Sequence, residues 1–131
     1  MISPKEILTR YWGFSTFRAP QEAIINSVLN QKDTIALLPT GGGKSICFQI
    51  PTLVQDGLCL VVSPLIALMN DQVQQLKDRN IKALALTSKI SQNELPTIFD
   101  NLQFGNYKFL YISPEKLQTS IVQERIRNLN I

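Results

Sequence analysis

Four short apolar runs recur along this chain, and each is followed by a segment with the spacing of a helix. The runs have the length and the unbroken apolar character of strands that are buried on both faces. They cover residues 34–38, 58–62, 83–86 and 109–112. Such strands alternating with helices predict an α/β fold in which helices cover both faces of a mostly parallel sheet, which makes three layers.

The segments between these runs carry the expected helices. Apolar residues at helical spacing predict helices over 45–54, 65–79 and 91–104, and a further helical segment over 114–131. One apolar stripe within 65–79 is expected to pack in the core. Its members are Leu65, Leu68, Met69, Val73 and Leu76.

The first third of the chain is predicted to be helical. Ser3 and Pro4 are a capping residue and a first-turn proline, and Gly13 is the expected end of this first helix. A second helix is predicted to begin near Pro20, because the apolar residues after it have helical spacing. They are Ile24, Ile25, Val28 and Leu29.

Composition narrows the class of protein. The chain has 131 residues, of which 44% are apolar and 18% charged, so it can bury a core and global disorder is not expected. A net charge of +3 is compatible with a nucleic-acid surface but is weak evidence for one. No apolar run reaches the length of a membrane span and the N-terminus lacks a signal-peptide stretch, so we expect a cytoplasmic protein with no membrane partner.

Cys47 and Cys59 each lie inside an apolar run, and the chain has no histidine. We expect both thiols to be reduced and buried in the core rather than joined in a disulfide or bound to a metal. Metal chemistry that depends on histidine is excluded by composition.

A glycine-rich loop, Leu38-Pro-Thr-Gly-Gly-Gly-Lys-Ser, joins the first apolar run to the helix after it. Backbone N–H groups can wrap a phosphate only where the chain approaches it closely, which glycine permits. The loop therefore predicts a site for ATP, in which Lys44 places its ammonium between the β- and γ-phosphates and Ser45 coordinates Mg²⁺. The residues predicted to surround the phosphates with them are Thr40, Gly41, Gly42 and Gly43. The alternative is a glycine-rich turn with a solvated lysine.

The surrounding sequence resembles a known family. Residues 38–51 look like motif I of the RecQ DNA helicases of superfamily 2, a family that accepts Leu or Met where the general phosphate-loop pattern has glycine and this chain has Leu38. Residues 13–22 are similar to its motif 0, residues 61–73 to its motif Ia, and residues 110–117 to a later motif of its first motor domain. The four occur in family order and spacing, and they cover essentially the whole chain.

The resemblance implies roles for three residues of motif 0. Phe14 matches the aromatic that stacks on adenine, Gln21 the glutamine that reads the adenine edge, and Arg18 an arginine near the nucleotide. The alternative for Phe14 is a core aromatic, and for Gln21 a helix-surface residue. Phe17 is expected to be a core residue.

The resemblance also implies a path for a DNA strand near the carboxyl ends of the strands. Ser63 could hold a DNA phosphate together with the first helical N–H groups, and it is also a good N-cap, which is a role that needs no DNA. Ordinary turn chemistry is the alternative for Thr87 and Ser88. The residues matched to DNA-contacting positions are Ser63, Pro64, Leu65, Thr87, Ser88, Ser113 and Pro114.

The fold implied by the resemblance is that of a P-loop NTPase of the RecA-like kind. Residues 1–131 would be the N-terminal part of its ATP-binding domain, with residues 1–33 as a helical motif 0 region. The chain contains no Asp-Glu pair and no histidine, so we expect it to stop before the family's DExH strand and to bind ATP without hydrolysing it.

The activity implied for the whole protein is that of an ATP-dependent 3′–5′ DNA helicase in DNA repair or recombination. Its partners would be ATP with Mg²⁺ and single-stranded or partly duplex DNA, and a bacterial protein would be associated with the nucleoid. The alternatives are an RNA helicase or other translocase, a short nucleotide-binding module without motor activity, and a phosphotransferase with a phosphate loop.

Overall fold

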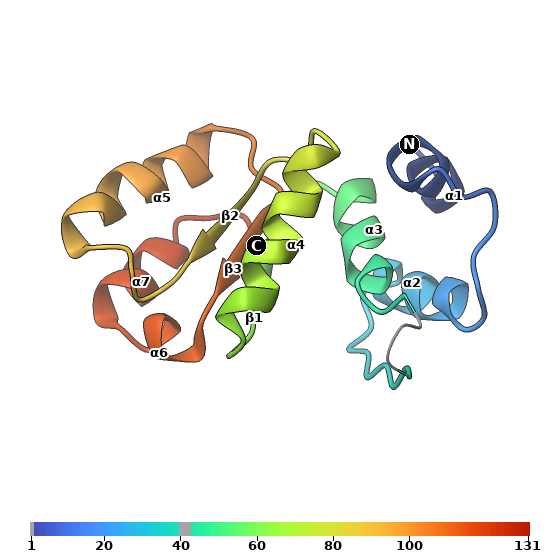
Figure 1. The fold of residues 1–131 in the computed structure, drawn as a ribbon, viewed down its shortest axis with the longest axis horizontal. Helices are drawn as coiled ribbons and strands as arrows, with labels where there is room; N and C mark the ends of the chain where they lie inside the picture. Colours follow the sequence, from blue (N-terminus) through green and yellow to red (C-terminus); the bar gives the residue numbers. More distant parts are fainter. Residues whose placement is uncertain (1, 40–42) are drawn as a thin grey trace. The chain divides into compact units, whose positions relative to one another are not determined.

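The chain is described by a computed structural model that covers residues 2–39 and 43–131. It forms two compact units, Met1–Asp56 and Gly57–Ile131. In Figure 1 the first unit (blue to green) consists of helices, and the second (green to red) of a small sheet with helices packed on it. Each unit has a hydrophobic core of its own.

The first unit begins with a helix that changes its pitch. α1 (Pro4–Ile7) starts after Ser3, whose Oγ accepts a hydrogen bond from the backbone N–H of Glu6 at 3.2 Å. A π-helical turn, η1 (Leu8–Trp12), continues it to Gly13, which has a left-handed φ of 75°. The predicted start at Ser3 and end at Gly13 are confirmed, whereas apolar spacing does not predict the π-helical turn.

Two further helices complete this unit. α2 (Gln21–Leu29) begins directly after Pro20, as predicted, and α3 (Ile46–Val54) lies within the predicted segment 45–54. The buried core of the unit consists of Ile7, Leu8, Ile25 and Ile50. Phe17 packs against this core, which confirms its expected structural role.

The predicted strand over residues 34–38 is wrong. Residues 34–39 form neither helix nor strand, and Ile35 and Leu37 are 92% and 90% exposed. The sheet that the structure describes consists of three other strands, so this run takes no part in its ladder of hydrogen bonds. An apolar run forms a strand only where a neighbouring strand satisfies its backbone N–H and C=O groups.

The second unit is built on a parallel sheet of three strands. They are β1 (Cys59–Val62), β2 (Ala83–Leu86) and β3 (Phe109–Ile112), in the spatial order β1-β3-β2. Both neighbouring pairs are parallel. The other three predicted strands and their parallel arrangement are therefore confirmed.

Helices cover both faces of this sheet, which confirms the predicted three layers for this unit. α4 (Ile66–Asp78) lies on one face, and α5 (Leu95–Phe104) and α7 (Ser120–Ile126) lie on the other (Figure 1). On the α4 side, Tyr111 Oη donates a hydrogen bond to Gln72 Oε1 at 2.7 Å. The core on the α5 side contains Leu58, Leu86, Leu95, Phe99, Leu102, Leu110, Ile112 and Val122.

The apolar stripe predicted for 65–79 is only partly buried. Met69, Val73 and Leu76 are buried at helical spacing, but Leu65 and Leu68 are 60% and 45% exposed. Leu65 precedes the first residue of α4 and has an extended backbone, so it does not share the helical stripe. Leu68 lies at the margin of a stripe that is centred on the other three residues.

A capping box opens the predicted helix 91–104. The backbone N–H of Ser91 donates to Glu94 Oε2 at 2.9 Å, and the side chain of Ser91 caps the same turn. The turn itself, η2 (Gln92–Glu94), is a 3₁₀ helix that leads directly into α5. The predicted helix is confirmed, with a tighter first turn.

The predicted helical segment 114–131 is broken in two. α6 (Pro114–Leu117) ends after one turn, and α7 follows from Ser120. At the break, Thr119 Oγ1 donates to the carbonyl of Lys116 at 2.7 Å. A local bond of this kind competes with the regular helical hydrogen bonds, so the helix does not continue through it.

Neither Cys47 nor Cys59 forms a disulfide. Cys47 is buried, as expected, and desolvation raises the pKa of its thiol, which disfavours the reactive thiolate at neutral pH. Cys59 is only half-buried, so the expectation of a fully buried thiol is wrong there.

No metal-binding cluster of three or more Cys, Asp or Glu side chains is present among residues 2–39 and 43–131. Within the same ranges, every helix is too short or too polar to cross a membrane.

Candidate functional site

The phosphate loop ends at the start of α3. Thr40, Gly41 and Gly42 lie outside the described residues. Gly43 has a left-handed φ of 74°, Lys44 is exposed, and Ser45 is a half-buried residue at the N-cap of α3. The helix expected to begin near Lys44 begins at Ile46, after a turn in which the N–H of Cys47 donates to the carbonyl of Lys44 at 3.1 Å.

Gln21 ties motif 0 to this loop. Its Oε1 accepts a hydrogen bond from the backbone N–H of Arg18 at 2.9 Å, and its Nε2 donates to the carbonyl of Gly43 at 3.2 Å. The side chain is buried, with only 3% exposed, so the alternative of a helix-surface glutamine is wrong. A segment predicted to contact adenine is therefore joined directly to a residue predicted to contact phosphate.

The other two motif 0 residues are open to solvent. Phe14 is 57% exposed, so the alternative of a core aromatic is wrong, and its carbonyl accepts a hydrogen bond from Thr9 Oγ1 at 3.0 Å. Arg18 is exposed, and its Nη2 lies 3.5 Å from the position that a Cβ on Gly43 would occupy. Arg18, Gln21 and Gly43 thus form one cluster.

Gln21→Ala should lower the free energy of unfolding by about 1–3 kcal/mol, because it removes both ends of a buried hydrogen-bonded amide. Urea unfolding of the chain followed by circular dichroism measures this change. The matched control is Gln123→Ala, which removes the same group from an exposed position of α7 and should change the free energy by less than about 0.5 kcal/mol. Equal unfolding midpoints for the two variants would show that the link to Gly43 contributes no stability.

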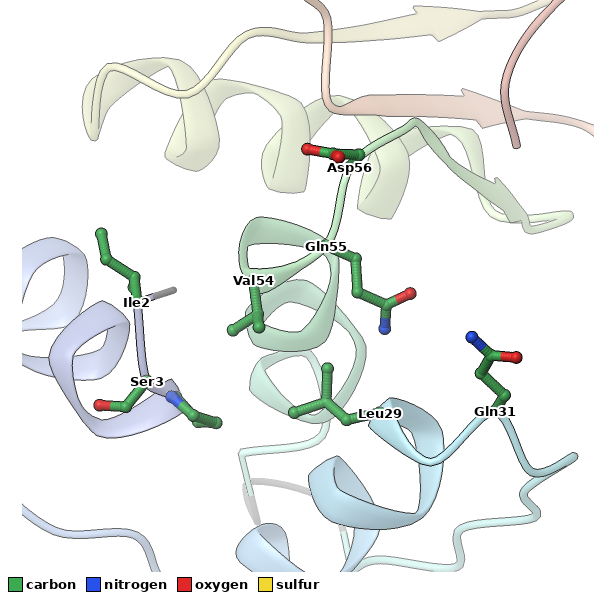
Figure 2. A pocket seen from close by; sticks show the side chains of 8 residues that line it. Ile2, Ser3, Leu29, Gln31, Val54, Gln55 and Asp56 are labelled. Carbon is green, nitrogen blue, oxygen red and sulfur yellow. The ribbon is translucent and has the colours of Figure 1, made fainter.

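Two cavities of the first unit bear on the predicted site, and neither gathers the predicted nucleotide residues. Figure 2 shows the larger, of about 780 Å³, where Leu29 and Val54 lie between Ser3 and the amides of Gln31 and Gln55. None of the predicted site residues lines it. The smaller, of about 280 Å³, is lined by Phe17, Arg18, Ala19, Pro20, Glu22 and Ala23, so it opens on the motif 0 loop beside Gln21.

In the second unit, the predicted DNA-contacting residues gather at one edge of the sheet. The last residues of the strands stand at one level, since Val62 and Leu86 both pair with Ile112. The residues that follow them carry hydroxyl groups and are Ser63, Thr87 and Ser113. The chain therefore places three of the predicted contacts side by side, as the parallel sheet led us to expect.

The hydroxyl groups of Ser63 and Ser113 already accept hydrogen bonds from backbone N–H groups. Ser113 is the N-cap of α6, and its Oγ accepts from the N–H of Lys116 at 3.3 Å. Ser63 is not the N-cap of α4, because that position is held by Leu65; its Oγ accepts instead from the N–H of Leu65 at 3.2 Å. Thr87 is buried, with 7% exposed.

The remaining predicted DNA contacts differ in their exposure. Pro64, Leu65 and Ser88 are exposed, whereas Pro114 is half-buried in the first turn of α6. The three exposed residues are therefore open to a ligand, whereas Thr87 and Ser113 are buried.

Comparison with known proteins bears on the whole chain. The profile of the DEAD/DEAH box helicases matches residues 18–131. The "Probable ATP-dependent DNA helicase RecS" of Bacillus subtilis (strain 168) is 47% identical over 132 residues, which is 100% of this chain and 26% of that protein. The "ATP-dependent DNA helicase RecQ" of Synechocystis sp. is 47% identical over 125 residues, which is 95% of this chain and 26% of that protein.

A third relative is also named as an ATP-dependent DNA helicase. The "ATP-dependent DNA helicase RecQ" of Haemophilus influenzae is 45% identical over 114 residues, which is 87% of this chain and 18% of that protein. The resemblance to the RecQ helicases is confirmed. The chain spans between 18% and 26% of the length of these three relatives.

Proposed function

The chain belongs to the DEAD/DEAH box helicase family, and on this premise we propose that it is the ATP-binding part of an ATP-dependent DNA helicase. Two relatives that are 47% identical to it carry that activity in their names. The observation that carries the proposal is the pair of hydrogen bonds between the Gln21 side chain and the backbone of Arg18 and Gly43, because it joins the adenine motif to the phosphate loop.

ATP binds to the first unit in this proposal. Phe14 stacks on the adenine with its exposed ring, and Arg18 and Gln21 hold the nucleotide from the same loop. The phosphates lie against Thr40, Gly41, Gly42 and Gly43, with Lys44 between the β- and γ-phosphates. The exposed side chain of Lys44 suits this role, because an ammonium on a flexible stem can follow the phosphates.

Mg²⁺ binds with the nucleotide in this proposal, and Ser45 is the protein ligand. The residue suits the ion, since its hydroxyl group is an oxygen ligand of the kind that Mg²⁺ prefers and lies at the start of α3. When bound, the ion would neutralise charge on the phosphates. Ser45 and Lys44 hold and orient the nucleotide there.

DNA contacts the second unit in this proposal, at the carboxyl ends of the strands. The contacts are to the backbone of a single strand or of a partly duplex substrate, so they position the strand without selecting a sequence. Ser88 and Pro64 face solvent there, next to the level at which the paired strands end. The residues assigned to this contact are Ser63, Pro64, Leu65, Thr87, Ser88, Ser113 and Pro114.

The proposal extends to movement along DNA from 3′ to 5′, in repair or recombination. The test is strand separation by the protein that carries this chain, with ATP and Mg²⁺, on duplexes with a 3′ or a 5′ single-stranded tail and on a matched RNA duplex. We expect 3′-tailed DNA to be opened and Lys44→Ala to abolish the reaction. Equal opening of RNA, or no strand separation by the wild-type protein, would contradict the proposal.

The 131-residue chain by itself should bind ATP and hydrolyse little or none of it. Hydrolysis needs an acidic group that holds the metal and orients the attacking water, and the chain has no Asp-Glu pair to supply it. Release of phosphate by the purified chain, compared with its Lys44→Ala variant, measures this. Brisk hydrolysis that is lost in the variant would show that another acid of this chain completes the site.

A further inference from the structure

Lys116 joins two of the strand ends at the predicted DNA edge. Its backbone N–H donates to Ser113 Oγ at 3.3 Å, directly after β3. Its side-chain Nζ donates to the carbonyl of Ile90 at 3.0 Å, in the loop that follows β2. One residue therefore contacts both segments, although they lie 26 positions apart along the chain.

The loop that Lys116 contacts spans residues 87–91, and hydrogen bonds within the chain fix both of its ends. The N–H of Ile90 donates to the carbonyl of Thr87 at 3.1 Å, and the capping box at Ser91 follows at once. Ser88 and Lys89 stand exposed at its tip. Lys116 itself is half-buried, so its ammonium is directed at a carbonyl group rather than outward to solvent.

We propose that Lys116 is a positioning residue, which holds the loop 87–91 in place so that the exposed Ser88 at its tip meets the DNA backbone beside the end of β3. The proposal rests on the proposed function, because it needs DNA to bind at this edge. Lys116 neutralises no phosphate in this role. Its ammonium acts through the loop, since it is hydrogen-bonded to the Ile90 carbonyl.

Lys82 offers a matched control within the same unit. It directly precedes β2, and its Nζ donates to the carbonyl of Gly105 at 2.8 Å. Lys82→Met therefore removes the same charge and the same kind of bond as Lys116→Met, but at the opposite end of the strand. A general effect of net charge on DNA binding should be equal in the two variants.

The experiment measures the affinity of the chain for a fluorescent oligo-dT strand at several salt concentrations. We expect Lys116→Met to weaken binding about tenfold, as for loss of one hydrogen bond to a charged group, and Lys116→Arg to restore most of it. The slope of log K against log salt should stay unchanged, since no phosphate contact is lost. Amide hydrogen exchange over 88–91 should become faster in Lys116→Met alone.

Three outcomes of this experiment would contradict the positioning role of Lys116. A slope that falls by about 0.7, as for one lost contact to a single strand, would show that Lys116 binds phosphate directly and would overturn the positioning role. Equal affinities for Lys116→Met and Lys82→Met would also overturn it, while leaving DNA binding intact. Failure of the wild-type chain to bind the strand would overturn the DNA contact of the proposed function, and the positioning role with it.

Discussion

Replacing Lys44 by alanine is expected to raise the Kd for ATP by about 10- to 150-fold, because a hydrogen bond to a charged group contributes about 1.5–3 kcal/mol. Lys44 is exposed, so the substitution should leave the fold unchanged. The affinity for adenosine should also stay unchanged, because our proposal assigns adenine to Phe14 and Gln21 and not to the lysine. Calorimetric titration with ATP and with adenosine measures both values.

The matched control for this variant is Lys77→Ala. Lys77 is an exposed lysine of α4, so its loss changes the net charge equally without touching the phosphate loop. Equal ATP affinities for the two variants would mean that the glycine-rich loop is only a turn with a solvated lysine.

Alanine in place of Gly43 is expected to destabilise the first unit and to weaken ATP binding together. A left-handed φ of 74° costs a residue with a Cβ about 1–2 kcal/mol. The Cβ would also collide with Nε2 of Gln21 and break the link between the two motifs. Crowding of this kind adds about 1–3 kcal/mol.

The variant Gly13→Ala separates the cost of the left-handed φ from the cost of the collision with Gln21. Gly13 has nearly the same φ, 75°, but nothing lies within 4 Å of the place where its Cβ would be. The excess loss of unfolding free energy in Gly43→Ala over Gly13→Ala therefore measures the collision with Gln21. The double variant Gln21→Ala/Gly43→Ala should recover that excess, and strictly additive losses would contradict the contact.

Much of the second unit follows from local sequence patterns. β1, β2 and β3 are apolar runs whose ladders lie within the same unit, and α4 and α5 carry regular apolar stripes, so local patterns and packing agree. The run over 34–38 is largely apolar, as these strands are, but it lies outside their sheet. A strand depends on a distant partner, and composition does not reveal whether that partner is present.

In the candidate site, too, local sequence did not predict contacts between residues that are distant along the chain. Motif and spacing predicted Gln21 as a nucleotide-contacting residue, but not that its amide would bond to Gly43, which is 22 positions away. The hydrogen bond from Lys116 to the carbonyl of Ile90 was not predicted either, because a lone lysine in a sequence gives no sign of such a contact. Both are side-chain contacts to distant backbone, which no local pattern encodes.

The most direct test of the ATP site is the ¹⁵N–¹H NMR spectrum of the chain titrated with a non-hydrolysable ATP analogue and Mg²⁺. Our account predicts that the largest shifts occur at the N–H groups of residues 40–46 and at the side-chain amide of Gln21. Shifts confined to Leu29, Val54 and Gln55 would place the nucleotide in the 780 Å³ cavity instead. That result, or an unchanged spectrum of a folded chain, would contradict the ATP site proposed for residues 38–45.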